Sequence, residues 1–351
     1  MKYVVNKADI LKEKQRIIDF WNENNKNELD EKFSWFYESN PDGIADTWLL
    51  TKETSSEIVG MATLFPRFFN NQGKTYRAGI QGDFFISKKH RSFGPALTLI
   101  RSISESFKDL NYDFIYGFPN RAAEPILRRA GFKRLGCLEK HVRLFDIERL
   151  LNEKFHAHNT IISATAKLGN VFLSLLYPDT WNFNFKRHRV KASLSIQNNV
   201  KDLTDSYSRS CFSTQKSFEY LRWKYEQDPD DKNFFFTVLD LDDTIIGCIV
   251  YRFDNNTIEI REIIYRNNQL EFMDLLSRFF RYAKSKNVEY AYFVSYENSC
   301  VLSRIADLQL SRANQGRSIY FLTNKMADSD GEITRLITES KLNLHNTDED
   351  T

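Results

Sequence analysis

An internal repeat constrains the fold of this chain more than any other feature of its sequence, because a duplicated unit determines both the number of domains and their internal order. Residues 35–42 (WFYESNPD) and residues 223–230 (WKYEQDPD) share Trp, Tyr, Glu, Pro and Asp in the same order. Each shared position is separated from its counterpart by the same 188 residues (223 − 35). Five identities in eight positions at one offset indicate two copies of one structural unit.

The similarity extends beyond this motif. Each copy has a short apolar run with a central glycine, 58–61 and 245–248, directly before a further apolar strand. Each also has an aromatic-rich strand that runs into an asparagine, 114–120 and 290–298. Both halves then follow the order helix, strand, strand, long strand, helix, strand, helix, strand. This order predicts the α/β or α+β class, with two mixed sheets, one in each half, and helices on both faces.

The length of 351 residues accommodates two packed domains. We expect an N-terminal domain over 1–145, a linker over 146–200, a C-terminal domain over 201–324 and a polar, mobile tail over 325–351. Within the linker, residues 161–177 predict an amphipathic helix. Because this helix lacks the basic polar face of an interfacial helix, we expect it to pack across both domains rather than on a membrane.

The overall composition narrows the class of partner. The formal net charge is only +2, and 42% of the residues are hydrophobic. These values are typical of a globular protein and provide no global basic field for nucleic acid. The first residues lack the pattern of a secretion signal, and no uncharged apolar run reaches the length of a membrane span. We therefore expect a cytoplasmic protein that binds no nucleic acid and has no membrane span.

The cysteines and histidines predict no metal site. The four cysteines are far apart and form no CxxC pair: Cys137, Cys211, Cys248 and Cys300. We expect them to be buried reduced thiols rather than parts of a disulfide framework. His156 and His158 form one close pair, but no carboxylate or cysteine stands at ligand spacing from them.

A basic, glycine-containing turn at residues 88–96 (KKHRSFGPA) joins a predicted strand, 78–87, to a predicted helix, 97–110. Such a turn can bind an anion, because free backbone N–H groups and the positive end of the helix dipole converge there. Gly94 lets the backbone approach a ligand closely, and Pro95 suits a first helical turn, where its missing N–H is harmless. The turn therefore predicts a phosphate site.

At these residues the sequence resembles the GNAT superfamily of N-acyltransferases. The pyrophosphate loop of that family has the pattern Arg/Gln-x-x-Gly-x-Gly/Ala, and Arg91, Gly94 and Ala96 fill its three defined positions. Residues 120–132 are similar to the second motif of the family, which begins with Asn, continues with small residues and closes with Gly-Phe. The strand before the loop and the helix after it provide the context that the family motif requires.

The resemblance covers about residues 30–145 in the first half and 215–322 in the second. It implies an enzyme that uses acyl-CoA and no metal, in which a splayed pair of parallel strands takes the pantetheine arm. It also implies nine residues that contact the coenzyme: Phe85, Ile86, Arg91, Ser92, Phe93, Gly94, Pro95, Ala96 and Asn120.

Two departures from the family pattern limit what carries over. The family often has a tyrosine four residues before the glycine of Gly-Phe, as the acid that protonates the leaving thiolate, and here that position is Leu127. In the second half, residues 266–270 replace the phosphate loop and contain no glycine. We therefore expect the second half to bind no coenzyme.

Acyl transfer to an amine requires a deprotonated amine and hydrogen-bond donors for the developing oxyanion. The sequence has no Gly-x-Ser-x-Gly elbow and no recognisable cysteine–histidine motif, so we expect direct attack rather than an acyl-enzyme. Asp83 lies on the strand where the family often positions an acidic base or an acceptor-binding carboxylate, and it is our candidate for the general base. His90 is a second candidate, nearer to the phosphates.

Charged residues in the second half indicate where the acceptor binds. Arg261 and Glu262 interrupt an otherwise apolar strand, and such charges need partners or a cleft. We expect both to face a groove between the halves and to bind the acceptor there. Four aromatic residues are candidates for stacking on its base or sugar ring, with core packing as the alternative: Tyr116, Phe118, Tyr292 and Tyr296.

The acceptor itself is inferred from the resemblance. Two-copy GNAT proteins of this kind resemble enzymes of bacterial surface-polysaccharide pathways that acylate a nucleotide-linked amino sugar. The expected substrates are acyl-CoA, with an acetyl or short hydroxyacyl group, and a dTDP- or UDP-linked amino-deoxy sugar. The resemblance leaves open aminoacyl transfer as in peptidoglycan-bridge enzymes, acetylation of another small amine, a non-catalytic binding role, and a homodimeric assembly.

Overall fold

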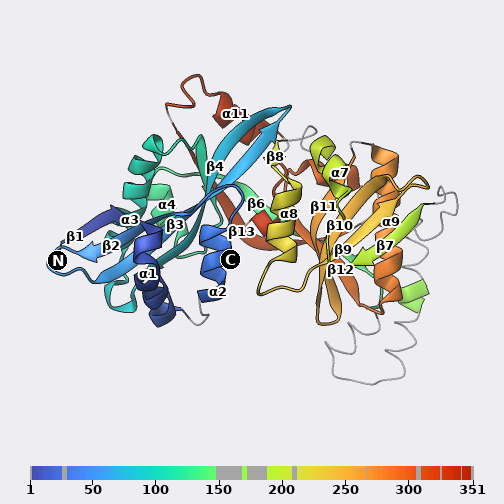
Figure 1. Cartoon of the computed structure of the whole chain (residues 1–351), viewed down its shortest axis with the longest axis horizontal. Coiled ribbons are helices and arrows are strands. Elements are labelled where there is room, and N and C mark those ends of the chain that lie inside the picture. Colours follow the sequence, from blue (N-terminus) through green and yellow to red (C-terminus); the bar gives the residue numbers. More distant parts are fainter. Residues whose placement is uncertain are drawn as a thin grey trace.

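The structure is a computed structural model of the chain, shown in Figure 1. It describes nine stretches: residues 2–25, 30–147, 168–171, 188–207, 212–266, 268–305, 310–324, 326–340 and 342–348. Of the helix expected over 161–177, only residues 168–171 are described, and these are helical. Within the described residues, no helix is long and apolar enough to cross a membrane.

The first half forms an antiparallel meander followed by a strand–helix–strand unit. Its main elements are β1 (Tyr3–Lys7), α1 (Ile10–Asn24), α2 (Asp30–Lys32), the π-helical turn η1 (Phe33–Glu38), β2 (Asp46–Lys52), β3 (Ile58–Asn71), β4 (Lys74–Ile86), α3 (Phe93–Ser106), β5 (Phe114–Gly117), α4 (Glu124–Arg129) and β6 (Lys133–Leu144). The long β3–β4 hairpin turns at Gln72 and Gly73, and the positive φ of both residues matches the twist of the flanking strands.

The second half repeats this order. Its main elements are β7 (Arg189–Ser193), α7 (Val200–Tyr207), β8 (Ser213–Thr214), α8 (Phe218–Leu221), the π-helical turn η5 (Arg222–Glu226), β9 (Phe234–Leu239), β10 (Ile245–Asp254), β11 (Thr257–Tyr265), α9 (Gln269–Ser285), β12 (Tyr290–Tyr296), α10 (Cys300–Ile305), β13 (Ser311–Thr323) and α11 (Glu332–Glu339). In each half one parallel pair, β4–β5 or β11–β12, follows antiparallel strands, so the predicted mixed α/β fold is confirmed.

The two halves exchange their last strands. Along the described sheet the central order is β4-β5-β13-β6-β12-β11, so β13 of the second half pairs with β5 of the first, and β6 of the first half pairs with β12 of the second. Figure 1 shows β13 and β6 crossing between the halves. The sheets expected for the two halves are therefore joined into one, because each exchanged strand covers an edge that would otherwise be open.

The two copies of the repeat motif lie against each other at the contact between the halves. The indole N–H of Trp35 donates to the Trp223 carbonyl at 2.8 Å, and the indole N–H of Trp223 donates to the Trp35 carbonyl at 2.9 Å. The two ring centroids are 5.3 Å apart. This reciprocal contact is the one expected when duplicated units meet around a local two-fold axis.

The C-terminal segment corrects one expectation. Residues 325–351 were expected to form a mobile polar tail, but α11 packs through Ile333 and Ile337, and Leu342 and Leu344 are buried. The expectation of mobility is therefore wrong for residues 342–348, whose apolar side chains lie in the core.

The cysteines are not all reduced. Cys248 is a buried free thiol and Cys137 is a half-buried one, whereas Cys300 is disulfide-bonded. Cys211 lies outside the described residues. The prediction of reduced thiols is therefore wrong at Cys300, because the spacing of cysteines along a chain does not show which of them form a disulfide.

Candidate functional site

The predicted phosphate loop connects β4 to α3 with the expected geometry. A short 3₁₀ turn at Lys88–His90 leads to Ser92, which precedes α3 in an extended conformation and makes no side-chain capping bond to the helix. The helix begins at Phe93, four residues earlier than predicted, because Pro95 is compatible with a first helical turn. Gly94 is exposed, and a Cβ atom placed there would meet no heavy atom of the described residues within 4 Å, apart from its chain neighbours and the backbone of its own helix.

A cavity of about 380 Å³ opens at the start of this helix. Seven of the nine residues expected to contact coenzyme line it: Phe85, Ile86, Arg91, Ser92, Phe93, Ala96 and Asn120. The other two, Gly94 and Pro95, lie in the first turn of α3 beside it. Asn120 also accepts hydrogen bonds from the backbone N–H groups of Ala122 and Ala123, both at 3.0 Å, and so fixes the turn before α4.

A second cavity, of about 350 Å³, adjoins the first and shares four lining residues with it: Phe84, Phe85, Asn120 and Ala123. It lies where β4 and β5 part. The two strands pair in parallel as far as Gln81 and Gly117. Beyond that point, Gly82 to Phe85 of β4 and Phe118 to Asn120 after β5 line opposite sides of the opening. The strand pair is therefore splayed, as the family resemblance implies.

Asp83 lines this second cavity from a β-bulge. Between two regular pairs of the β3–β4 ladder, Asp83 and Phe84 lie opposite Ala62 alone, and Asp83 has a φ of 44°. Such a bulge disrupts the ladder and redirects a side chain. The hydroxyl of the buried Tyr37 donates a 2.5 Å hydrogen bond to the Asp83 carboxylate. This bond orients the carboxylate in the cavity.

The second cavity contains residues that sequence reasoning missed. Arg317 reaches it from β13, at a point where three residues of β13 lie opposite one residue of β6. Lys32 lines the same cavity from α2. Leu127, at the position of the family's acidic tyrosine, also lines it. His90 lines neither cavity and instead hydrogen-bonds the Tyr3 hydroxyl at 3.0 Å.

The structure does not bring the expected acceptor residues together. Tyr116 is buried and packs edge-to-face on Phe69, so core packing, the alternative considered for it, applies. Glu262 is fully buried in an ion pair with Lys216 at 2.7 Å, and it therefore lines no open groove. The expectation that Glu262 faces the acceptor is wrong because a cation distant in sequence satisfies its charge inside the protein.

Arg261 and the three remaining aromatic candidates also lie at separate places in the structure. Arg261 pairs with Asp231 at 2.6 Å and lines a cavity of only about 120 Å³ between the halves. Phe118 lines the cavity at Asp83. Tyr296 is buried, and Tyr292 donates to Asp254. Of the four aromatic candidates, Phe118 alone lines a cavity described here.

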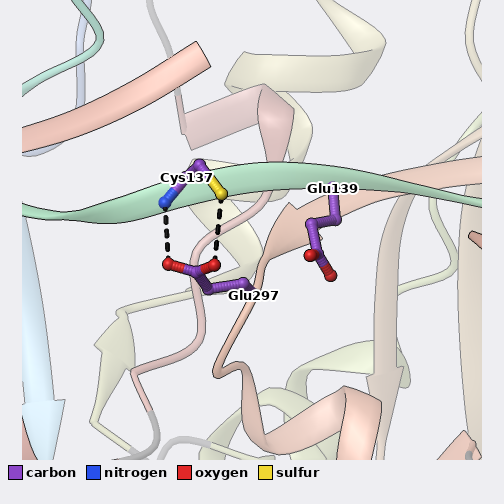
Figure 2. A group of neighbouring side chains, drawn as sticks. All are labelled: Cys137, Glu139 and Glu297. Atoms are coloured by element: carbon purple, nitrogen blue, oxygen red, sulfur yellow. Dashed lines mark hydrogen bonds between the residues drawn. The ribbon is translucent and has the colours of Figure 1, made fainter. Parts of the chain in front are cut away.

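A cluster of possible metal ligands lies elsewhere, at the junction of the exchanged strands (Figure 2). Cys137 and Glu139 come from β6, and Glu297 follows β12. The backbone N–H and the thiol of Cys137 both donate to the Glu297 carboxylate at 3.1 Å. Burial, followed by this carboxylate, raises the pKa of the Cys137 thiol to about 11. Glu139 is paired with Arg312. With the thiol protonated and both carboxylates engaged, the cluster is satisfied without an ion.

The helix start in the second half differs from that of α3. The Asn268 side chain accepts a hydrogen bond from the Leu270 N–H at 3.0 Å and thus caps α9. Leu270 stands second in α9, where α3 has Gly94. The start of α9, which is capped and carries a large side chain, has fewer free N–H groups and less space for a phosphate than the glycine-containing start of α3.

The fold is similar to those of known acyltransferases. A chain from Enterococcus faecalis V583, described as a conserved protein of unknown function and probable N-acyltransferase, has a TM-score of 0.67 at 11% identity, over 93% of this chain and 74% of that one. A GCN5-related N-acetyltransferase from Anabaena variabilis has a TM-score of 0.61 at 10% identity, over 93% and 74%. Saccharomyces cerevisiae N-myristoyltransferase with bound myristoyl-CoA has a TM-score of 0.52 at 12% identity, over 91% and 82%. The sequence matches no protein-family model and no curated protein.

Proposed function

We propose that this chain transfers an acyl group from acyl-CoA to the amino group of a nucleotide-linked amino sugar by direct attack. The observation that carries the proposal is the pair of adjoining cavities between the start of α3 and the Asp83 carboxylate. One cavity has the chemistry of a pyrophosphate site, and the other has a carboxylate suited to an amine. The chain has the fold of the GNAT acyltransferases.

The coenzyme half of the proposal rests on the start of α3. Its first-turn N–H groups receive no capping bond from Ser92, and the helix dipole favours an anion there. Arg91 lines the same cavity and adds a guanidinium that can bind phosphate oxygens in bidentate fashion. The opening after Gln81 and Gly117 would then receive the pantetheine arm and direct the thioester toward Asp83.

In the reaction, the Asp83 carboxylate attracts the protonated amine and accepts one of its protons. The neutral amine attacks the thioester carbonyl carbon, and a C–N bond forms. The tetrahedral intermediate then collapses with cleavage of the C–S bond. Its nitrogen gives a second proton to the departing thiolate, and the proton held by Asp83 passes to water. The hydrogen bond from Tyr37 keeps the Asp83 carboxylate in one orientation during these steps.

The acceptor class follows from the other charges in this cavity. Lys32 and Arg317 line it together with Asp83, so two cations accompany one carboxylate. An acceptor with an amine and a nearby diphosphate would complement this set, because guanidinium and ammonium groups bind phosphate oxygens while the carboxylate binds the amine. This charge pattern favours a nucleotide-linked amino sugar over an amine that carries no phosphate.

The proposal is tested with the purified full-length chain, acetyl-CoA and a panel of acceptors. The panel holds a dTDP-linked amino-deoxy sugar, a UDP-linked amino sugar, the corresponding free amino sugar and an aminoglycoside. Release of coenzyme A is followed by thiol titration, and the product is identified by mass spectrometry. We expect activity with a nucleotide-linked sugar and at least about tenfold lower kcat/KM with the free sugar, the cost of losing charge-assisted hydrogen bonds.

Other outcomes would redirect the assignment. Equal activity on the free sugar would refute the diphosphate contact and favour a small-amine acetyltransferase. Transfer from an aminoacyl-tRNA, with no reaction of acetyl-CoA, would favour the peptidoglycan-bridge type of chemistry. Failure to bind any acyl-CoA would leave a non-catalytic binding role.

A further inference from the structure

The second half repeats the strand geometry of the site at Asp83. β11 and β12 pair in parallel as far as Ile260 and Phe293, and the ladder ends there, just as the β4–β5 ladder ends at Gln81 and Gly117. β11 also carries an extra residue opposite β10, at Arg261, and β4 carries one opposite β3, at Asp83 and Phe84; each lies within three residues of the end of the parallel ladder. The second half therefore has an opening between parallel strands at the position of the first-half cavity.

The acidic residues Asp83 and Glu262 occupy equivalent positions in the two halves. Asp83 stands two residues beyond the last β4–β5 pair, and Glu262 stands two residues beyond the last β11–β12 pair. Tyr37 donates to Asp83 at 2.5 Å, and Tyr225, its counterpart in the repeat, donates to Glu262 at 3.3 Å. The opening between β11 and β12 is thus the counterpart of the cavity that contains Asp83.

Residues 342–348 of the chain occupy this counterpart opening. One edge of β12 pairs with β6 as far as Tyr296. On the edge that β11 has left, the Tyr296 N–H donates to the Leu344 carbonyl at 2.8 Å, and Ser295 forms an antiparallel bridge with His345. The C-terminal segment therefore takes the place of a strand beside β12.

The same segment also contacts β11 and a residue of the second half that packs on β3. The Thr347 hydroxyl donates to the Arg261 carbonyl of β11 at 3.0 Å. The Asn343 N–H donates to the Phe212 carbonyl at 2.9 Å, and the Phe212 ring packs 5.3 Å from that of Phe69 on β3. The segment is consequently held from three sides: by β11, by β12 and by the residues that lie on β3.

A buried charge anchors the end of the segment. Asp348 pairs with Lys216 at 2.8 Å, and Lys216 also pairs with Glu262 at 2.7 Å; all three side chains are fully buried. The Thr214 hydroxyl donates to Asp348 at 2.9 Å. Lys216 therefore pairs with both the carboxylate that corresponds to Asp83 and the carboxylate that the segment brings in.

From these contacts we infer that the opening between β11 and β12 is a peptide-binding site, and that residues 342–348 are its bound ligand. The ligand class is a peptide that pairs with the β12 edge through one short stretch and then places a carboxylate on Lys216 from a 3₁₀ turn, Asn346–Asp348. The occupied site explains, independently of the proposed acyl transfer, why the counterpart of the Asp83 cavity is closed in the second half.

Hydrogen exchange of the full-length chain tests this inference at one amide. Asp348→Asn removes the charge that anchors the segment, so the Tyr296 N–H, which donates to Leu344, should exchange at least about tenfold faster. An excess of a synthetic peptide with residues 342–351 should restore its protection in that variant, whereas the same peptide with the Asp348→Asn change should not. Asp330→Asn, an exposed acid of the same C-terminal region, is the matched control and should leave Tyr296 unchanged.

Two results would overturn the inference. One is parental exchange at Tyr296 in Asp348→Asn. The other is an equal rise at amides throughout the sheet, since that would mark a general loss of stability rather than release of a bound segment. If Asp348→Asn does not fold, Thr347→Val decides instead. It removes the hydrogen bonds of the Thr347 hydroxyl with Arg261 and Tyr225 but keeps the buried charges, so it should raise exchange at Tyr296 but not in β3 or β4.

Discussion

Gly94→Val tests the coenzyme loop without disturbing the fold. Gly94 stands second in α3 and is exposed. Apart from its chain neighbours and its own helix backbone, no heavy atom of the described residues lies within 4 Å of the point where a Cβ would stand. Valine also has a higher helix propensity than glycine. The variant should therefore fold with at least the stability of the parent.

The magnitude follows from what the valine would displace. The open space beside Gly94 is where a pyrophosphate would approach the N–H groups of the first turn. A branched side chain there would separate the anion from one or two of these donors, and each charge-assisted hydrogen bond contributes about 1.5–3 kcal/mol. Binding should weaken by about 2 kcal/mol or more, which corresponds to a roughly 30-fold higher Kd.

Titration calorimetry with coenzyme A measures both the Kd and the stoichiometry. The parent should bind one coenzyme per chain, because the start of α9 is capped by Asn268 and lacks a glycine. Leu270→Val is the matched control, since Leu270 is the exposed second residue of α9. An unchanged Kd in Gly94→Val would refute the phosphate-loop assignment, and two coenzymes per chain would refute the difference between the halves.

Three further predictions concern titratable side chains. Asp83→Asn should lower kcat by about 10²–10⁴-fold, which is the usual contribution of a general base, and should leave the Kd for coenzyme A unchanged. A kcat equal to that of the parent would contradict the role of Asp83 as the base. Because the pKa of the Cys137 thiol is raised to about 11, its alkylation by iodoacetamide should be slow at pH 7.5 and should accelerate toward pH 11, as measured by mass spectrometry. Fast alkylation at pH 7.5 would contradict the contact with Glu297. Burial lowers the pKa of His141 and His345 below the ordinary value of 6.5. The unfolded chain therefore binds more protons below that pH, and the free energy of unfolding should fall as the pH drops through 6.5. Thermal unfolding at pH 8 and pH 5.5 measures this loss of stability, which His141→Gln should reduce.

Local features of the site could be predicted from the sequence because their residues are contiguous. Arg91, Gly94 and Ala96 lie within one loop, so the strand–turn–helix pattern suffices to bring them together. Asp83 and Asn120 could be predicted to lie close together for a similar reason, since each stands near the end of one of two adjacent parallel strands. The periodicity of the strands and the repeat likewise predicted the mixed sheet.

What the sequence could not predict depends on pairing over long distances. Arg317 lines the first-half cavity only because β13 and β6 are exchanged, and nothing in the composition of either strand distinguishes exchange from pairing within a half. Glu262 was expected in a groove because its charge interrupts an apolar strand. Lys216 and Asp348, which satisfy that charge, lie 46 and 86 residues from it (262 − 216 and 348 − 262), beyond the reach of any local pattern.

Lys216→Met tests how much the buried charges contribute. The substitution keeps a long side chain but leaves Glu262 and Asp348, both fully buried, without their cation. Breaking a buried pair in this way costs about 3–5 kcal/mol of unfolding free energy. Glu262→Gln should cost less, because Lys216 keeps its pair with Asp348. Urea denaturation at pH 7 measures both changes, and the Kd of the first half for coenzyme A should be unaltered in each.

The pH dependence of the Lys216→Met effect separates charge from packing. In the parent, burial opposes ionisation of Asp348, but the Lys216 charge prevails and lowers the pKa of that carboxyl. The stability that this pair contributes is therefore present above the unfolded pKa of about 4 and is lost as the pH falls through the lower folded value. In Lys216→Met the carboxylates are buried without a cation, so their protonation should stabilise the variant as the pH falls. The difference between parent and variant should thus narrow from pH 7 to pH 4. A difference that stays constant over this range would show that Lys216 acts through its packing and would refute the electrostatic account of the buried cluster.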